Sequence, residues 1–346
     1  MPEHAFVSNN ETRLLSDEQF LRKVAYLYYE DGHSQEAIAE MEFCSRQTIS
    51  KALQKARDRD IVRISITPDL RFGYLRNLSR EVRVKLGLED LLLVAGRNMN
   101  AVASNEHLDD VVTEIAIAAA DYLDQMLTDA DILAVSGGRM FMRNLIRYLK
   151  PGRALPHLQV VATIGFVEPS TSSGDANMIA HDLAMAYGAS HLWFPCPAFL
   201  TTKEQVEYTR RLPIIKEAYD MMMRANVIVL GLWTPGTNRD MLARGIFTQE
   251  QLTIIESARP VADINHWVFD ISGRCINDTL KNFPYCLSGL EIPRLREKIK
   301  EHNTKVILIA GGSPSYIPAI RAALNAGLAN ILVTDHVTAQ LLLMGS

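Results

Sequence analysis

Cysteine is scarce in this sequence: its 346 residues include four cysteines, which lie far apart and form no Cys-x-x-Cys pair. So few and so scattered cysteines argue against a disulfide framework and against a zinc finger, and they fit a reducing cytosol. We therefore expect a cytoplasmic protein that holds neither a metal nor a cofactor.

Long apolar runs are also missing. The longest candidate, residues 111–123, falls short of the about 18 residues that span a bilayer, and it carries Glu114 and Asp121. The first 20 residues have no basic stretch followed by an apolar run, so they predict no signal peptide. We expect no membrane partner.

The chain as a whole has no excess of basic charge. It carries 36 basic and 40 acidic residues, a formal net charge of −4. This balance excludes a uniformly basic nucleic-acid coat, but it leaves room for a small basic patch on one domain. Hydrophobic residues make up 48% of the sequence, which excludes disorder over most of the chain.

Common catalytic motifs are absent as well. The sequence contains no His-Glu-x-x-His, nucleophile elbow, Walker loop or Gly-x-Gly-x-x-Gly. His181 and Asp182 are neighbours in sequence, but adjacent helical residues point in different directions and form no pair by themselves. Among nine histidines, chance proximity of His266 to an acid is expected. We therefore expect no catalytic residue.

Three short helices are predicted near the N-terminus, after a flexible segment 1–16. Residues 17–30 place apolar side chains at helical spacing, and Ser34 and Ser45 are typical N-caps of a second and a third helix. Ile38, Ala39 and Met41 form the expected buried side of the second helix. Residues 61–66 alternate like a strand. Two short helices joined by a tight turn, with another packed before them, indicate a helix-turn-helix.

The turn of this motif departs from the usual pattern. The position that normally needs positive φ, and therefore glycine, is Phe43, and the inward-facing position before it is Glu42. These departures leave open a turn of different construction.

The outer face of the third helix carries side chains that bond base edges and phosphates: Arg46, Gln47, Thr48, Ser50, Lys51 and Gln54. Residues 46–63 contain six basic residues against two acidic ones, a cationic strip expected for phosphate contact. Operator DNA is the predicted partner. The alternatives are a three-helix domain that binds protein, or a run of charges that is merely solvated.

The remainder of the chain alternates short apolar runs with helical segments. The expected strands are residues 91–95, 132–135, 160–164, 191–194, 227–230, 306–310 and 331–333. Helices such as 109–126 and 314–325 separate most of them, so we predict an α/β fold with a mainly parallel sheet covered on both faces. The expected divisions are the flexible N-terminus 1–16, the helix-turn-helix 17–67, a linker helix 68–88 and an effector domain 89–346.

Two glycine pairs stand directly after predicted strands. Gly137 and Gly138, with Arg139 next to them, follow the strand 132–135, and Gly311 and Gly312 follow the strand 306–310. Ligands of open α/β sheets bind at the carboxyl ends of strands, near helix N-termini that favour anions. We expect the backbone N–H groups of both loops to contact a ligand.

Several segments follow one another along the chain in an order that, taken together, is specific for one protein family. They are YYEDGHSQEAIAE, SRQTISKALQKARDRDIVRISI, DADILAVSGGRM, VIVLGLW, ARGIFTQEQL, PVADINHWVFDISGR, VILIAGG and AIRAALNAGLANILVTDHVTAQLLL. In these segments the chain resembles the SorC/DeoR-type family of bacterial sugar-responsive transcription regulators, over roughly residues 20–345. The resemblance implies a Rossmann-like effector domain, related to sugar-phosphate isomerases and deaminases, that regulates a DNA-binding domain. It also implies a homodimer or homotetramer.

The resemblance assigns effector-binding positions too. Gly138 and Arg139 match the family's Trp-Gly-Arg-Thr loop, whose Trp and Thr are replaced here. Tyr316 stands where the family often carries a phosphate-pairing lysine, and Trp233 ends a loop that is commonly Gly-Ile-Gly. Asp263 resembles a position that bonds ligand hydroxyls, as a carboxylate can.

Other polar residues have two readings. Asn265 is expected to assist Asp263. Asn277 and Asp278 are either ligand contacts or turn residues, and Asp175 is either a helix N-cap or a ligand contact.

The departures from the family pattern remove a cation, a hydroxyl and an open glycine, and they add aromatic faces, which stack on sugar rings or apolar surfaces. Among sugars, polyols and sugar phosphates, we therefore expect an unphosphorylated or weakly anionic derivative. The predicted function is regulation of a carbohydrate-utilisation operon, with residues 70–86 transmitting the signal. The alternative is a sugar-phosphate isomerase- or deaminase-like enzyme with an appended interaction domain, for which Asp263 lacks a convincing acid–base partner.

Overall fold

The computed structural model describes residues 14–59, 61–62, 73–96, 108–167, 174–234, 236–301 and 304–344. The chain divides into two compact units, residues 1–70 and 71–346. Most of the predicted flexible segment 1–16 and of the predicted strand 61–66 lies outside the described residues. No helix among the described residues is long and apolar enough to cross a membrane.

The first unit contains α2 (Glu18–Tyr29), α3 (Gln35–Met41) and α4 (Arg46–Asp58). Each helix begins at a capping side chain, because Asp17, Ser34 and Ser45 accept hydrogen bonds from backbone N–H groups of the first turns. Both predicted serine caps are confirmed. Apolar side chains from all three helices share one small core. Met41 was expected in that core, but 46% of it is exposed because it ends the short α3.

The turn between α3 and α4 keeps the conformation that glycine usually supplies. Phe43 has φ of 52°, in the left-handed region, and its side chain is 98% exposed. The Glu42 side chain is only 13% exposed and forms an ion pair of 2.8 Å with Lys23 of α2. An ion pair therefore fills the position that is normally apolar.

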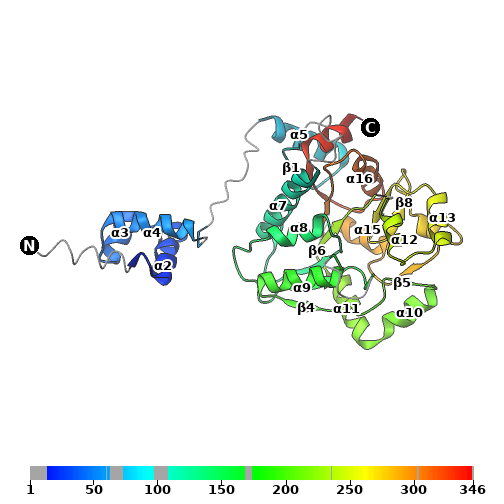
Figure 1. Ribbon diagram of the computed structural model, residues 1–346, viewed down its shortest axis with the longest axis horizontal. Helices are drawn as coiled ribbons and strands as arrows, with labels where there is room; N and C mark the ends of the chain where they lie inside the picture. The colour runs from blue at the N-terminus through cyan, green and yellow to red at the C-terminus, as the bar shows by residue number, and fades with distance from the viewer. Residues whose placement is uncertain are drawn as a thin grey trace, which may run out of the picture. The chain divides into compact units, whose positions relative to one another are not determined.

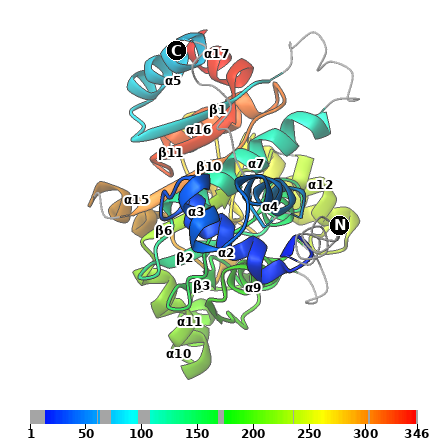
Figure 2. The same cartoon turned by 90° about the vertical axis from the view of Figure 1, so that its left-hand side faces the viewer.

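A seven-stranded parallel sheet forms the centre of the second unit, and all seven predicted strands are present in it. Its strands are β1 (Asp90–Val94), β2 (Ile132–Val135), β3 (Gln159–Ala162), β4 (Ser190–Leu192), β6 (Val227–Gly231), β10 (Lys305–Ile309) and β11 (Ile331–Asp335). The order across the sheet is β1-β11-β10-β6-β2-β3-β4, which Figure 2 shows for the first six strands from top to bottom. The predicted α/β fold is confirmed.

Helices cover the sheet in the way right-handed crossovers require. α7 (Leu108–Met126), α8 (Phe141–Tyr148) and α9 (Ala176–Tyr187) pack in sequence along one face (Figure 1). α11 (Pro213–Arg224), α15 (Ile292–Lys300) and α16 (Tyr316–Asn325) belong to crossovers in the opposite direction. Smaller helices are α10 (Lys203–Arg211), α12 (Gly236–Ala243), α13 (Gln249–Ser257) and α14 (Ile276–Thr279).

The predicted linker helix is present as α5 (Gly73–Leu86), which packs with α17 (His336–Met344) against β1. Leu78 and Val82 of α5 are buried in the core of the second unit. The linking role assigned to residues 68–88 stays a prediction, because residues 63–72 lie outside the described residues.

Two short antiparallel pairs were not predicted, because strands of two or three residues show no clear alternation. β5 (Phe199–Leu200) pairs with β9 (Cys286–Leu287), and β7 (Ala262–Ile264) pairs with β8 (Trp267–Phe269). The β7–β8 hairpin turns through two residues with positive φ, Asn265 at 55° and His266 at 64°. This is the backbone of a tight two-residue hairpin turn, and it presents His266 to the site described below.

Candidate functional sites

The predicted reading face lies on α4. Arg46, Gln47, Ser50, Lys51 and Gln54 are all exposed. Thr48 is not on that face: it is only 2% exposed, and its hydroxyl lies 2.8 Å from the Ser45 hydroxyl. The expectation that Thr48 faces outward was wrong, because the third residue of this helix turns back toward its N-cap.

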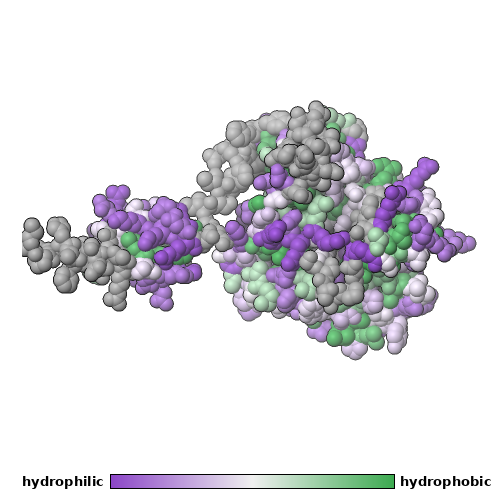
Figure 3. Space-filling view, viewed as in Figure 1, coloured by the Kyte–Doolittle hydropathy of each residue, from purple (hydrophilic) through white to green (hydrophobic). Residues whose placement is uncertain are grey.

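Weak exposed contacts hold the cationic side chains of this unit. Arg46 pairs with Glu36 of α3 at 2.7 Å, and both side chains are more than half exposed. Arg57 donates to the Tyr29 hydroxyl at 3.0 Å. Exposed ion pairs contribute about 0–1 kcal/mol, so a phosphate can replace Glu36 at little cost. Much of the visible surface of α2 to α4 is hydrophilic (Figure 3).

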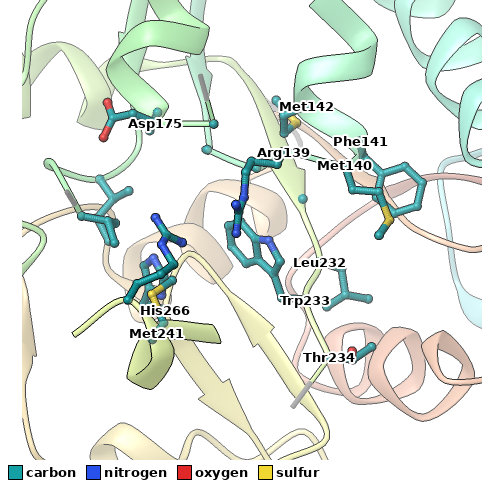
Figure 4. A pocket seen from close by; sticks show the side chains of 18 of the residues that line it. Arg139, Met140, Phe141, Met142, Asp175, Leu232, Trp233, Thr234, Met241 and His266 are labelled. Atoms are coloured by element: carbon teal, nitrogen blue, oxygen red, sulfur yellow. The ribbon is translucent and has the colours of Figure 1, made fainter. Parts of the chain in front are cut away.

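The second unit has a cavity of about 400 Å³ at the carboxyl ends of β2, β3 and β6. From β2 the chain continues to β3 on one side, whereas from the neighbouring β6 it continues to β10 on the other side. Open α/β sheets bind ligands at such switch points. Figure 4 shows side chains around it. Its wall comprises Gly137, Gly138, Arg139, Met140, Phe141, Met142, Ile164, Val167, Gly174, Asp175, Ala176, Gly231, Leu232, Trp233, Thr234, Met241, Arg244, His266 and Tyr316.

Four of the eight predicted effector-binding residues lie on this wall: Gly138, Arg139, Trp233 and Tyr316. They come from the loops after β2 and β6 and from the first residue of α16. The fold thus brings together residues that are almost 180 positions apart in sequence. Their contact with a ligand stays a prediction.

The other glycine loop does not reach the cavity wall. The Gly312 N–H donates to the Asp335 carboxylate at 2.7 Å, and Asp335 is 2% exposed. Asp335 also accepts bonds from the backbone N–H groups at the start of α17. A carboxylate of the chain itself therefore occupies the position expected for a ligand anion at Gly311 and Gly312.

Asp263 and Asn265 are also off the wall, contrary to expectation. Asp263 is 2% exposed and accepts a bond of 2.9 Å from the His266 N–H. Asn265 forms two hydrogen bonds with Thr163: its side-chain oxygen accepts from the Thr163 hydroxyl at 2.8 Å, and its amide NH₂ donates to the Thr163 carbonyl at 3.0 Å. Asn277 likewise bonds the hairpin backbone at Val268. Asn265 thus holds the β7–β8 hairpin to the end of β3, whereas Asp263 and Asn277 stabilise the hairpin itself.

Two glycines on the wall allow close approach rather than an open anion cradle. The Gly138 N–H donates to the Gly174 carbonyl at 2.8 Å. A Cβ on Gly138 would lie 3.5 Å from the Trp233 ring, and a Cβ on Gly174 would lie 2.5 Å from Cγ of Arg139. The two loops therefore pack together, and the missing side chain at Gly174 leaves the space that Arg139 fills.

Trp233 and His266 form a stacked pair on the wall. Their ring centroids are 5.6 Å apart and their planes differ by 11°. The Trp233 backbone exchanges two hydrogen bonds with Asp263, at 2.9 and 3.0 Å. Because both its backbone and one face of its ring are held, Trp233 is a fixed aromatic surface.

Burial shifts the pKa of two groups at this surface, the carboxyl of Asp263 and the imidazole of His266. It raises the pKa of Asp263 to about 7. Burial, together with the positive charge of Arg244, lowers the pKa of His266 to about 4, so its imidazole is neutral at neutral pH. The Asp263 Oδ2 and His266 Nδ1 atoms are 3.8 Å apart.

The sequence did not single out Arg244, Met241 or Thr234 as wall residues. Arg244 and Met241 lie at the end of α12, away from any strand end, and only the segment ARGIFTQEQL pointed near them. Of the two roles expected for Asp175, the N-cap is confirmed, because it accepts a bond of 2.9 Å from the Asn177 N–H at the start of α9. Asp175 also lines the cavity, and its contact with a ligand stays a prediction. Burial raises its pKa.

A helix-turn-helix unit followed by a parallel α/β domain with a ligand-sized cavity defines a ligand-responsive transcriptional regulator. The family described as "Putative sugar-binding domain" matches residues 71–344. The chain belongs to this family, and its resemblance to the SorC/DeoR-type regulators is confirmed.

Named relatives match along nearly the whole chain. The deoxyribonucleoside regulator of Bacillus subtilis is 26% identical over 328 residues, covering 94% of this chain and 97% of the relative. The sorbitol operon regulator of Klebsiella pneumoniae is 25% identical over 341 residues, covering 94% and 98%. The crystal structure of full-length SorC from Klebsiella pneumoniae has a TM-score of 0.65 at 22% identity, covering 94% of this chain and 98% of that chain. It shows that the fold is shared.

Proposed function

We propose that the chain is a DNA-binding transcriptional regulator of a carbohydrate-utilisation operon, controlled by a sugar or polyol derivative in the cavity of the second unit. The observation that carries this proposal is the exposed polar face of α4 together with a ligand-sized cavity at the sheet's switch point. The relatives support it, because they are named as regulators and match this chain over nearly their whole length. Its work on an operator would take place in the cytoplasm.

α4 would enter the major groove with its N-terminal residues facing base edges. Arg46 and Gln47 can donate to bases, whereas Lys51 is suited to phosphate. One α4 reads only a few base pairs, so a homodimer or homotetramer would pair half-sites one helical turn apart or more.

Control would come from a ligand that favours one of two arrangements of the protein. A coupling free energy of about 1–3 kcal/mol changes operator affinity by about 5- to 150-fold. α5 is the proposed transmitter, because it packs against β1 and lies next after the first unit in the chain.

Mutation of the reading face tests the DNA-binding part. Arg46→Ala combined with Lys51→Ala removes two exposed cations from α4, so operator affinity at moderate salt should fall at least about tenfold, with a shallower salt dependence. Fluorescence anisotropy of a labelled DNA duplex, taken from the region upstream of the gene that encodes this chain, measures the affinity and its salt dependence.

Arg211→Ala combined with Lys216→Ala is the matched control, because it removes the same two charges from exposed positions on α10 and α11. Equal losses for the two double variants would contradict recognition through α4.

The enzyme alternative rests on His266, which lies beside Asp263 and lines the cavity. The relatives are named as regulators, so this reading is not favoured. Incubation with free and phosphorylated sugars followed by product analysis tests it directly.

A further inference from the structure

The cavity wall is predominantly apolar and aromatic. Among the described residues it presents three methionines and three aromatic side chains. The methionines are Met140, Met142 and Met241, and the aromatic residues are Phe141, Trp233 and Tyr316. Such surfaces favour a ligand with an apolar, polarisable part.

Side chains that would bond several hydroxyl groups face the protein instead. Asp263, Asn265 and Asn277 are each engaged with the hairpin or the end of β3. Within the described part of the wall, Asp175 is the one carboxylate, and it already caps α9.

Backbone groups that could cradle a terminal phosphate are also engaged. The Gly138 N–H donates to the Gly174 carbonyl, and the Gly312 N–H donates to Asp335. The space beside Gly138 is filled by Trp233 and Met142. In each predicted glycine loop, one N–H group that could hold an anion is therefore already bonded within the chain.

Two guanidinium groups provide the main hydrogen-bond donors of the wall, Arg139 and Arg244. Each guanidinium carries five N–H donors in a fixed plane, so one existing contact leaves others for a ligand. The beginning of α8, next to Arg139, has no side-chain cap. This part of the cavity suits ligand oxygens that accept hydrogen bonds.

We infer that the ligand of this cavity is a sugar derivative that carries a flat apolar ring, such as an aryl or nucleobase glycoside. The ring lies against the Trp233 and His266 surface, and the acceptor oxygens of the sugar face Arg139 and Arg244. This inference rests on the proposed function for the identity of the site, and it names the class of effector.

Matched ligand pairs test the inference on the full-length protein. The pairs are methyl and phenyl β-glucoside, ribose and uridine, and ribose 5-phosphate and uridine 5′-monophosphate. We expect the ring-bearing member of at least one pair to bind about tenfold more tightly by calorimetry. Trp233→Leu should abolish that preference, and Trp233→Phe should restore part of it.

Trp193→Leu is the control substitution, because Trp193 stacks on Phe166 and His181 and does not line the cavity. It should keep the preference. The inference is overturned if the plain member binds as tightly in every pair, if no ring-bearing member binds at millimolar concentration, or if the preference survives Trp233→Leu.

Operator binding is measured with the same ligands to separate the two proposals. If a plain sugar or sugar phosphate changes operator affinity without any preference for a ring, regulation stands and the inference fails. If a ring-bearing ligand binds through Trp233 but leaves operator affinity unchanged, the inference stands and the proposed regulation fails.

Discussion

At the scale of single residues, Asp263 and His266 give the second unit a pH dependence with two opposing parts. Burial raises the pKa of Asp263 from its ordinary value of 3.8 to about 7 in the folded chain, so its contribution to stability decreases as pH rises through that interval. Burial, with the charge of Arg244, lowers the pKa of His266 from its ordinary value of 6.5 to about 4 in the folded chain, so its contribution to stability increases with pH over that interval.

Replacing Asp263 should expose the histidine part alone. The two effects oppose each other between about pH 4 and 6.5, so the joint contribution of Asp263 and His266 to the free energy of unfolding should vary little there. His191, whose pKa burial also lowers to about 4, adds the same rise to the natural chain and to the variant. Asp263→Asn should rise in stability with pH over this range and remain level above it. Urea denaturation followed at several pH values measures the effect, with Asp220→Asn of α11, whose side chain is 49% exposed, as control. Parallel pH profiles for Asp263→Asn and the natural chain would rule this account out.

Gly174 has no side chain to touch a ligand, but the space that it leaves determines where Arg139 lies. A Cβ at Gly174 would lie 2.5 Å from Cγ of Arg139 and 3.2 Å from its backbone nitrogen, so Arg139 must move in Gly174→Ala. Directional guanidinium bonds tolerate little displacement. We expect cavity ligands to bind about tenfold more weakly by calorimetry.

Gly152→Ala is the control, because a Cβ there meets one atom, at 3.4 Å, and lies away from the cavity. Unchanged ligand affinity in Gly174→Ala would show that Arg139 has no part in binding.

Sequence reasoning succeeded for residues whose role is local. Ser34 and Ser45 were recognised as caps because a cap is defined by its own helix. It failed for Gly312, whose N–H bonds Asp335 far along the chain, and for Asp263, which is covered by packing around the hairpin. Such partners become known only when the sheet is assembled.

At the scale of elements, the turn between α3 and α4 stores strain at Phe43. Its φ of 52° is unfavourable for a residue with a side chain, and its ring is 98% exposed, so it contributes little burial. Phe43→Gly should therefore stabilise this unit by up to about 1 kcal/mol. Hydrogen exchange of the α3 and α4 amides in the full-length protein measures the gain as slower exchange.

Phe43→Ala separates strain from loss of the ring, because alanine keeps a side chain at the same positive φ. Its exchange rates should stay close to those of the natural chain. Exchange in Phe43→Gly that is as fast as in Phe43→Ala would contradict strain at this position, and faster exchange in Phe43→Ala than in the natural chain would mean that the exposed ring stabilises the turn.

Elements of four or more residues were predictable where their apolar pattern was clear. All seven strands of the parallel sheet were found, because β2, β3, β6, β10 and β11 are mostly buried apolar runs and β1 is a run of leucines that ends in valine. The three-residue edge strand β4 is not buried, and it was found only as part of the expected strand 191–194. The β7–β8 hairpin was not found, because three-residue strands show no usable period. That omission explains why His266 was missed as a wall residue.

At the scale of the whole molecule, the proposed function couples ligand binding in the second unit to DNA binding by the first. A ligand in the cavity can change operator affinity only if it binds more tightly to one arrangement of the protein than to another. By the same linkage, operator DNA must change ligand affinity by the same factor. This reciprocity distinguishes a regulator from a DNA-binding unit joined to an independent ligand-binding domain.

The most direct measurement is therefore a pair of titrations on the full-length chain, using the cavity ligand that binds most tightly among the sugar and glycoside pairs. One follows operator affinity by anisotropy with and without saturating ligand, and the other follows ligand affinity by calorimetry with and without operator. The account predicts the same change in both, between about 5- and 150-fold. An operator affinity that stays constant while the cavity fills would contradict it.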